Sequence, residues 1–375
     1  MILTEDQRLL QDTVRPFMAE EGAIKKQLRH WRDTGCTDGY GTDLWKQFAE
    51  LGLTGILIPE AQGGAGLGQV EAGLVLEEIG RNLTPSPYLT TALAAVRALE
   101  GSAQAERWFP GVLAGDTVAA LAVDEGKHHD PAGIALEAKR QGNGFVVNGA
   151  KQFVVHGNSA DVILVAARTG GLPGETDGLT LFAVEKGMSG LEVETATLAD
   201  SSKAARLGFN NVSVDADAVV GEVDGGWKPL SRALNAGRAG AAAELVGVAA
   251  GASEMTFEYL KQRKQFGRLI GEFQALQHRA AHLYGEIEIA RAAALKAAKL
   301  LDAGDEQAEL FISVAKAKAG RVTALAVQEG VQMHGGIGMT DEHDIGLYMK
   351  REVVLSELFG SPRFHANRVA ELSGY

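Results

Sequence analysis

The sequence predicts an α+β protein in three consecutive segments: an N-terminal helical domain, a middle antiparallel β-barrel domain and a C-terminal four-helix bundle. Three observations lead to this prediction. Apolar residues recur at helical spacing up to about residue 99, short β-rich runs fill residues 115–221, and long alanine-rich runs occupy most of the remainder. We place the domains at residues 1–115, 116–222 and 223–375.

The N-terminal segment opens with a capping-box pattern, because Gln7 follows Thr4 by three residues. Apolar residues at helical spacing predict a helix after this cap, and three further amphipathic helices at residues 42–53, 70–79 and 90–99. The glycine-rich stretch at residues 59–66 follows no expected strand and lacks the Lys-Ser/Thr pair of a phosphate-binding loop. We expect it to be a simple connector.

The middle segment has a strong hairpin signal at Asn148-Gly149. Both residues tolerate the positive φ angles of a tight two-residue turn, and β-rich residues flank them from 144 to 155. We therefore expect two strands joined at this turn. Further strands at residues 162–167, 179–184 and 212–214, with no helical pattern between them, favour a small antiparallel barrel or sandwich.

The C-terminal segment is helical. Long runs rich in alanine predict helices at residues 230–262, 273–303, 305–332 and 346–358. Glycines at positions 267, 304, 335 and 336 separate these runs, as is typical of helix ends. Helices of this length with short connections favour a four-helix bundle.

The composition excludes several classes of protein. The chain has 375 residues, 46% of them hydrophobic, and its net charge of −12 argues against a nucleic-acid-binding protein, which needs clustered Lys and Arg. Cys36 is the only cysteine, which excludes an intramolecular disulfide and a cysteine-rich metal site. The first residues lack a signal-peptide pattern and no apolar run reaches the length of a membrane span, so we expect a cytoplasmic protein.

Two motifs near the C-terminus carry a family resemblance: Arg263-Lys264-Gln265-Phe266-Gly267 and Gln332-Met333-His334-Gly335-Gly336-Ile337-Gly338. With these motifs and its α-β-α order, the chain resembles the acyl-CoA dehydrogenase family over essentially its whole length. The resemblance implies a two- or fourfold symmetric assembly, FAD as cofactor, and removal of two hydrogens across the carbons next to an acyl-CoA thioester. It also implies an electron-transferring flavoprotein as the electron acceptor.

In this family each FAD spans a subunit interface, with the flavin ring on one subunit and the pyrophosphate and adenosine held largely by the neighbour. The residues that match the second half are retained here. By resemblance, Arg263 contacts the pyrophosphate in a bidentate manner and Phe266 supplies an apolar contact beside it. The other matches are Gln274, Gln332, Gly335 and Gly336. Without the family match, Arg263 would be interpreted as a solvated helix-end charge and the glycines as a helix cap.

The residues that match the flavin half are missing. Val155 stands where the family offers a hydroxyl to the flavin N5 edge, and valine has no hydroxyl to donate. The loop at Asp124–His129 does not reproduce the family's Thr-Glu-Pro and Gly-Ser pattern. Phe359 occupies the position at which most of the family carries the glutamate that removes the proton next to the thioester. A phenyl ring cannot accept that proton.

The base must therefore lie elsewhere, if this chain has one. Some family members place it on the first long C-terminal helix, at the position of Gly237, so that route is also closed. Glu244 lies two helical turns further along the same face, about 10.5 Å away, and a carboxylate among alanines is a candidate base. Alternatively, Glu244 pairs with an arginine inside the bundle. Glu357 is a poorer choice, because a two-residue offset from Phe359 turns it to another face.

The histidines do not indicate a metal site. His128 and His129 lack the spaced acidic or cysteine partners that metal ligands need, so we expect them to be polar loop residues. We expect His334 and His365 to form local hydrogen bonds rather than a catalytic pair.

Retained and missing residues together favour one subunit of a heteromeric acyl-CoA dehydrogenase, of the kind known from bacterial breakdown of sterol side chains. A different subunit would carry the base, and this chain would complete its FAD site. Two alternatives stay open. A self-sufficient homomeric dehydrogenase would use Glu244 or another displaced base. A non-catalytic acyl-CoA-binding or scaffold protein on the same fold would bind ligand without flavin, although such a protein has no need of Arg263 and Gln332.

Overall fold

The chain divides into two compact units in the computed structural model, which describes residues 3–375. We call them the bundle unit, formed by residues 3–30, Gln69–Pro85 and Arg238–Tyr375, and the sheet unit, formed by Trp31–Gly68 and Ser86–Gly237. The bundle unit is thus assembled from three separate stretches of chain. The domain boundaries expected near residues 115 and 222 stay predictions.

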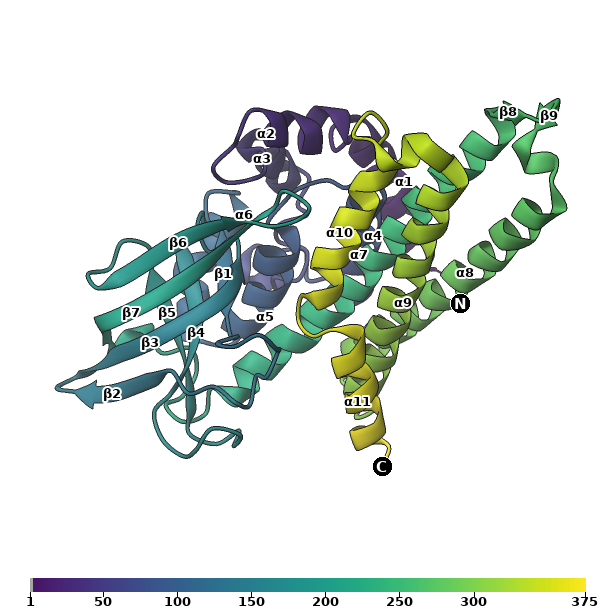
Figure 1. The fold of residues 1–375 in the computed structure, drawn as a ribbon. Helices are drawn as coiled ribbons and strands as arrows, with labels where there is room; N and C mark the ends of the chain where they lie inside the picture. The colour runs from purple at the N-terminus through teal and green to yellow at the C-terminus, as the bar shows by residue number, and fades with distance from the viewer. Residues whose placement is uncertain (1–2) are drawn as a thin grey trace. The chain divides into compact units, whose positions relative to one another are not determined.

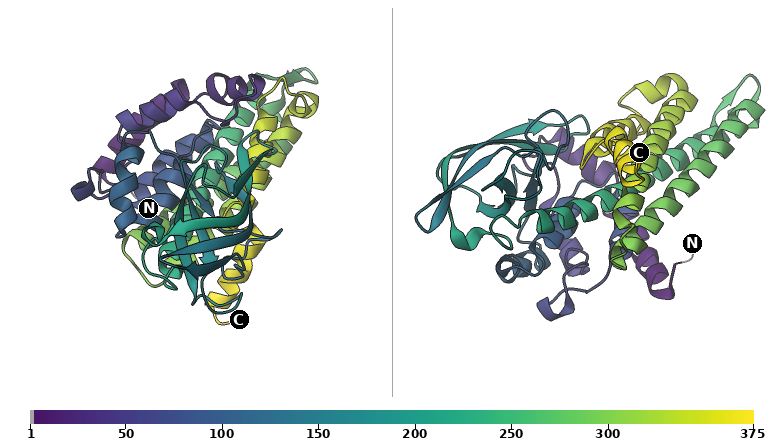
Figure 2. Two further views of the ribbon diagram at one scale, coloured as in Figure 1. Left: turned by 90° about the vertical axis from the view of Figure 1, so that its left-hand side faces the viewer. Right: turned by 90° about the horizontal axis from the view of Figure 1, so that it is seen from below.

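Long helices dominate the bundle unit, and α8 and α9 run side by side (Figure 1 and Figure 2). Helix α7 begins in the sheet unit and continues into the bundle unit from Arg238 onward. The helices are α1 (Glu5–Glu20), η1 (Lys25–Arg29), α4 (Gln69–Arg81), α7 (Trp227–Gln262), η5 (Ile270–Glu272), α8 (Gln274–Asp302), α9 (Ala308–His334), η6 (Gly335–Met339), α10 (Ile345–Glu357) and α11 (Pro362–Leu372). Strands β8 (Lys264–Gln265) and β9 (Arg268–Leu269) form a short hairpin between α7 and α8.

Specific polar contacts fix where several of these helices begin. The predicted capping box is confirmed: the Gln7 amide donates to Thr4 Oγ1 at 3.2 Å, and the Thr4 amide donates to Gln7 Oε1 at 3.0 Å. The first amides of α4, those of Gln69 and Val70, donate to the carboxylate of Asp302 at 2.6 and 3.1 Å. The end of α8 therefore caps the start of α4, a contact between residues that are far apart in the sequence.

Glycines let α4 and α7 approach each other closely. A Cβ atom added to Gly80 would lie 2.1 Å from the Glu244 carbonyl oxygen, and one added to Gly247 would lie 2.0 Å from the Glu77 carbonyl oxygen. Any side chain at these two positions would push the helix backbones apart. Only glycine allows this packing distance.

The sheet unit contains a seven-stranded sheet with the order β1-β4-β2-β3-β7-β6, in which β5 pairs with β4. Its strands are β1 (Ala119–Ala122), β2 (Glu137–Gln141), β3 (Gly144–Val155), β4 (Val162–Arg168), β5 (Leu179–Glu185), β6 (Leu191–Thr197) and β7 (Lys203–Asp215). Shorter elements are α3 (Thr42–Glu50), η2 (Glu60–Gln62), η3 (Leu89–Ala95), α5 (Val96–Leu99), α6 (Ala103–Leu113) and η4 (Ala216–Ala218). Helix α2 (His30–Asp33) falls where the chain passes between the units.

The pairing within the sheet differs from the prediction in two respects. Strand β4 pairs in parallel with β1 and β2, so the sheet is mixed rather than purely antiparallel. The predicted hairpin at Asn148-Gly149 is wrong, because β3 runs straight through these residues and pairs with β7 on both sides of a bulge. The turn lies instead between β2 and β3, at Gly142-Asn143. Long-range pairing with β7 has outweighed the local turn preference.

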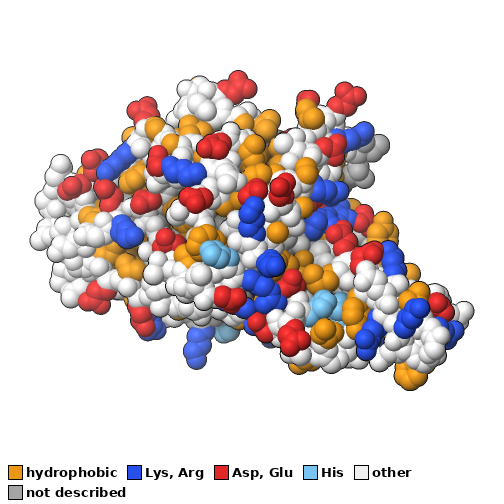
Figure 3. Space-filling view, turned by 90° about the horizontal axis from the view of Figure 1, so that it is seen from above, with side chains coloured by type: hydrophobic (Ala, Val, Ile, Leu, Met, Phe, Trp, Pro, Cys, Tyr) orange, Lys and Arg blue, Asp and Glu red, His pale blue; other side chains and the backbone are white. Residues whose placement is uncertain are grey.

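Among the described residues, no helix is long and apolar enough to cross a membrane. On the face shown in Figure 3, acidic and basic side chains are interspersed rather than gathered by sign.

Candidate functional site

The retained motif residues lie in one region of the bundle unit, where α7 ends, the β8–β9 hairpin turns and α9 ends. Leu260, Ile270 and Met333 form a small apolar core there, and Phe273 and Leu276 pack against it. We call Arg263, Phe266, Gln274, Gln332, Gly335 and Gly336 the hairpin-end cluster. The structure thus brings together the chain segments that carry both C-terminal motifs.

The side chains of the hairpin-end cluster are turned outward. Phe266 is 89% exposed, and Arg263, Gln274 and Gln332 are exposed as well. Within residues 3–375 the Arg263 guanidinium has no ion-pair partner. An added Cβ atom on Gly335 or Gly336 would meet no other atom of the described chain within 4 Å. This surface offers a guanidinium, an aromatic ring and open backbone to something outside the chain.

Two histidines and a tyrosine line the inner side of this cluster. The His334 ring stacks on Tyr259 with a centroid distance of 4.4 Å, and the His343 ring lies 4.4 Å from His334 and 6.2 Å from Tyr259. His334 Nδ1 donates to the Gly330 carbonyl at 2.7 Å, as expected for a local hydrogen bond. Its buried Nε2 has no hydrogen-bond partner among the described residues, and burial lowers the pKa of the ring. This stack was not predictable from the sequence, because its three rings come from different segments of the chain.

Phe359 lies in the turn between α10 and α11. Its backbone has a φ of 61°, in the left-handed region, and the residue is only 6% exposed. Arg238 Nε donates to the Phe359 carbonyl at 3.3 Å, and His365 Nε2 donates to the same oxygen at 3.1 Å. Because a carbonyl only accepts, the proton of His365 resides on Nε2, and Nδ1 faces Ser313 Oγ at 3.3 Å. The turn is held by polar groups yet carries no carboxylate at position 359.

A buried lysine completes the hold on this turn. Lys316, on α9, is fully buried, and its Nζ donates to the carbonyls of Leu355, Ser356 and Gly360 at 3.2, 2.8 and 3.3 Å. Leu355 and Ser356 belong to the last turn of α10, whose carbonyls lack partners within the helix, so the amine caps that end. Burial lowers the pKa of Lys316 to about 7, although nearby Glu357 raises it. Lys316 was not predicted from the sequence, because nothing in its local sequence distinguishes it from Lys318.

The candidate base Glu244 lies inside the bundle unit and is 2% exposed. Its carboxylate accepts two hydrogen bonds from the Arg351 guanidinium, one of them from Nε at 3.0 Å. The carboxylate is therefore already engaged by an arginine of the same unit. The structure therefore favours the alternative of a buried ion pair. Glu357 is exposed. Glu352 lies five residues earlier, and burial raises its pKa.

In the sheet unit, Val155 ends strand β3 and pairs with Ala204 of β7. It is 8% exposed and offers only methyl groups. Phe153, two residues earlier, has a φ of 53° at a second irregularity of the strand. The position at which the family offers a hydroxyl to the flavin thus lies at a strand end and has no donor side chain.

The loop at Asp124–His129 is tied to β3 and to itself. Lys151 Nζ donates to Glu125 Oε1 at 2.7 Å and to the Val123 carbonyl at 2.9 Å, and Gln152 Nε2 donates to the Glu125 carbonyl at 2.9 Å. His129 Nδ1 lies 2.8 Å from Asp124 Oδ1. Burial lowers the pKa of Lys151 to about 8, although Glu125 raises it. The polar side chains of this loop are used for internal contacts.

The two loop histidines have different surroundings. His128 is exposed, and His129 pairs with Asp124. Within residues 3–375 no group of three or more His, Cys, Asp and Glu side chains is placed to hold a metal ion.

Comparisons with known proteins bear on all three segments. Models of the N-terminal, middle and C-terminal domains of acyl-CoA dehydrogenase match residues 4–116, 119–212 and 224–373. A cyclohex-1-ene-1-carbonyl-CoA dehydrogenase from Geobacter metallireducens is 32% identical over 95% of this chain and 94% of its own length.

Solved structures give the same result. A steroid ACAD named as the pair Tcur3481-Tcur3483 has a TM-score of 0.88 and 30% identity, covering 98% of both chains. Butyryl-CoA dehydrogenase from Megasphaera elsdenii has a TM-score of 0.89 and 25% identity, covering 100% of this chain and 99% of its own.

Proposed function

The chain belongs to the acyl-CoA dehydrogenase family of FAD-dependent oxidoreductases, and on that basis we propose that it is one subunit of a heteromeric acyl-CoA dehydrogenase. In this proposal a different subunit carries the base, and this chain completes that subunit's FAD site. An electron-transferring flavoprotein is the proposed electron acceptor. The steroid ACAD named as the pair Tcur3481-Tcur3483 provides a precedent by likeness of fold and sequence.

One observation carries the proposal: the hairpin-end cluster is exposed and uncommitted, whereas position 359 is buried and has no carboxylate. The Arg263 guanidinium forms no ion pair within residues 3–375, so its five donors are available to an external anion. Phe359 is 6% exposed, and its carbonyl is already bound by Arg238 and His365. A chain that worked alone would instead need an accessible carboxylate at position 359.

The residues of the hairpin-end cluster fit the pyrophosphate and adenosine half of FAD. Arg263 would bind the pyrophosphate through two parallel N–H groups, and Phe266 would cover apolar cofactor surface. Gly335, with a φ of 66°, and Gly336 leave room for close approach of the cofactor to the backbone. When bound, FAD supplies the acceptor for the hydride that leaves the acyl group. Residues of this chain hold and orient the cofactor.

The residues expected to hold the flavin ring fit that group poorly. Val155 has no hydroxyl, and the Glu125 carboxylate is bound by Lys151 and by the backbone amides of Ala135 and Leu136 at 2.9 Å each. No catalytic step is therefore assigned to this chain's own flavin position. The chemistry is assigned to the partner subunit.

Copurification tests the proposal. We would express the chain alone and together with a second family member that carries the glutamate, and then measure FAD per subunit and bleaching of flavin absorbance by acyl-CoA. The chain alone should hold little FAD and show no turnover, and the complex should hold FAD and bleach. Stoichiometric FAD with turnover in the chain alone would overturn the proposal.

A pair of neighbouring variants sharpens this test. Arg263→Ala should lower the FAD content of the complex, because the pyrophosphate loses its bidentate partner. Lys264→Ala removes the charge of the neighbouring residue, which is also exposed, and should leave the FAD content nearly unchanged. Equal losses in both variants would show that only the overall charge of the hairpin matters.

The two alternatives make different predictions. A self-sufficient dehydrogenase that used Glu244 would lose bleaching by substrate in Glu244→Gln, but the pairing of Glu244 with Arg351 opposes this role. A scaffold protein would bind acyl-CoA without flavin even beside a partner. The open backbone at Gly335 and Gly336 weighs against the scaffold alternative, since it has no packing role within the described chain.

A further inference from the structure

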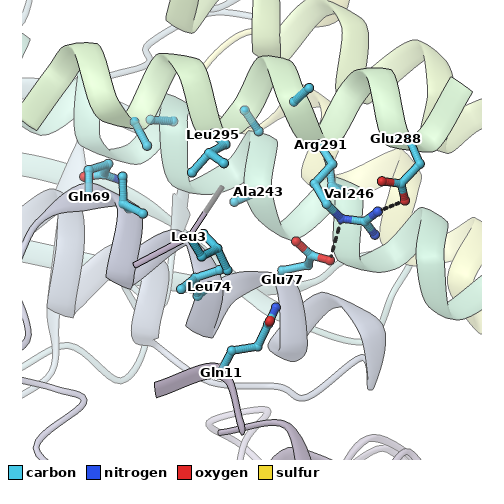
Figure 4. Close-up of a pocket in the computed structure, with 16 residues that line it drawn as sticks. Leu3, Gln11, Gln69, Leu74, Glu77, Ala243, Val246, Glu288, Arg291 and Leu295 are labelled. Carbon is cyan, nitrogen blue, oxygen red and sulfur yellow. Dashed lines mark hydrogen bonds and ion pairs between the residues drawn. The ribbon is translucent and has the colours of Figure 1, made fainter. Parts of the chain in front are cut away.

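A cavity of about 280 Å³ opens among four elements of the bundle unit, namely α1 together with Leu3 ahead of it, α4, α7 and α8 (Figure 4). Apolar side chains form most of its wall, with Leu3 and Leu74 on one side and Ala243 and Leu295 on the other. The cavity belongs to neither the hairpin-end cluster nor the turn at Phe359. It therefore calls for an explanation of its own.

The cavity arises from small side chains rather than from helices that fail to meet. Helices α4 and α7 are in close contact at Gly80 and Gly247, so their axes are already near each other. Around the cavity, α7 contributes Ala239 and Ala243, and α8 contributes Ala298, where bulkier residues would fill the space. The lining positions follow helical spacing on each helix, so one continuous stripe of each faces the hollow.

The charged groups at the two ends of the cavity already have partners. At one end Glu77 accepts hydrogen bonds from Arg291 at 3.0 Å and from Arg81 at 3.2 Å, and Arg291 also pairs with Glu288. At the other end, beside Gln69, the Asp302 carboxylate caps α4. An anionic ligand would have to compete with these carboxylates for the guanidinium groups, and a cation would disrupt paired charges.

We propose that this cavity binds an uncharged, apolar small molecule. Its volume is nearly twice that of an engineered apolar cavity of about 150 Å³ that stays dry and binds benzene. The fitting ligand is therefore an uncharged hydrocarbon of about two fused rings or a short aliphatic chain. Binding would replace water at an apolar wall and leave the ion pairs at both ends intact.

Equilibrium dialysis with two matched probes tests the charge requirement. Naphthalene and 2-naphthoate share the same rings but differ by one negative charge. Naphthalene should bind the purified chain at least about tenfold more tightly than 2-naphthoate, because the carboxylate finds no free cation in the cavity. Equal affinity for the two probes, or no binding of naphthalene, would overturn the proposal.

Cavity-filling variants test the location. Ala243→Leu and Ala298→Leu should each weaken naphthalene binding by about tenfold or more, since the added side chain occupies the space of the ligand. Ala281→Leu places the same side chain on an exposed part of α8 and should leave binding unchanged. If one filling variant does not fold, as judged by circular dichroism, the other decides. Unchanged binding in a folded filling variant would place naphthalene elsewhere and refute the cavity site.

A charge variant at the rim provides an independent check. Glu288→Gln removes one of the carboxylates that compete for Arg291. It should strengthen binding of 2-naphthoate and leave binding of naphthalene as it was. If 2-naphthoate does not respond, Arg291 does not face the bound probe and the assignment of the charged end is wrong.

Discussion

Phe266 and Phe359 each precede a glycine and each adopt a left-handed backbone, with φ values of 55° and 61°. Their surroundings are opposite, because Phe266 is 89% exposed and Phe359 is 6% exposed. A bulky residue in this region costs about 1–3 kcal/mol, so each turn must be stabilised by something else. In the buried turn the compensation is visible: the ring is buried, and Arg238, His365 and Lys316 bind the surrounding carbonyls.

The hairpin at Phe266 has little such compensation inside the chain. Its ring meets Phe273 edge to face at a centroid distance of 6.2 Å, and otherwise faces solvent. Strain that is balanced by internal contacts is what we expect of a structural turn. A strained turn with an exposed ring is what we expect of a surface that binds an external ligand.

The same substitution at both phenylalanines is the strongest test of this difference. Phe359→Ala should lower the free energy of unfolding by about 3–5 kcal/mol, because it empties a buried ring position. Phe266→Ala should change it by no more than about 0.5 kcal/mol. Urea denaturation of the two variants measures both values. Similar losses would mean that the two turns are equally structural.

The lysine that holds the buried turn gives the next largest effect. Lys316→Met should cost about 2–3 kcal/mol, since three buried carbonyls lose their donor. Lys318→Met, two residues along the same helix, removes a partly exposed ion pair with Glu286 and should cost less than about 1 kcal/mol. Denaturation curves that place the two variants together would contradict the capping role of Lys316.

A change in the exposed hairpin should affect binding rather than folding. Arg263→Lys keeps the charge but loses the bidentate geometry, so the dissociation constant of the heteromer for FAD should rise about tenfold, or about 1.4 kcal/mol. Arg268→Lys is the control, because Arg268 stacks over Phe273 at 4.0 Å in the same hairpin. Flavin release measured by fluorescence gives both constants. A larger effect at Arg268 would shift the binding role to the stacked arginine.

The smallest expected effect is the pH dependence of the buried turn. The pKa of Lys316 is about 7 in the folded chain and lies near its ordinary value of 10.5 in the unfolded chain. Between these values the unfolded state binds one more proton, so the stability that Lys316 contributes rises with pH.

Relative to Lys316→Met, the wild-type chain should gain about 1 kcal/mol between pH 7 and pH 8. Urea denaturation at pH 7, 8 and 9 measures this gain, with Lys318→Met as the flat reference. A difference that shrinks with pH would mean that the ammonium form is the one the fold prefers.

Local signals in the sequence predicted the local features correctly. The capping box at Thr4 and Gln7 depends on residues three apart, and the long helices depend on composition over many turns. The Asn148-Gly149 turn failed, because a strand far along the chain pairs across it. Sequence order alone does not contain that pairing.

In the candidate site, too, only residues marked by a local motif were predictable. Motif matches selected Arg263 and Gly335, and whether these residues hold FAD stays a prediction. The hydrogen bonds that hold the turn at Phe359 were not predictable. Their donors, Lys316, Arg238 and His365, come from three helices, and each has an unremarkable local sequence. Glu244 could be selected as a carboxylate among alanines, but its partner Arg351 lies 107 residues away.

The discontinuous bundle unit has a consequence for protein synthesis. Helices α1 and α4 leave the ribosome early and pack against each other, yet the remaining long helices of the bundle unit begin only at Arg238, after the whole sheet unit has been made. At about 5–20 residues per second, the roughly 150 intervening residues take about 8–30 s to synthesise. During that interval α4 can pack against α1 but lacks its later neighbour α8, and the carboxylate of Asp302 that caps α4 does not yet exist. The nascent chain therefore carries α1 and α4 with the side of α4 that later meets α8 uncovered until the C-terminal helices have been made.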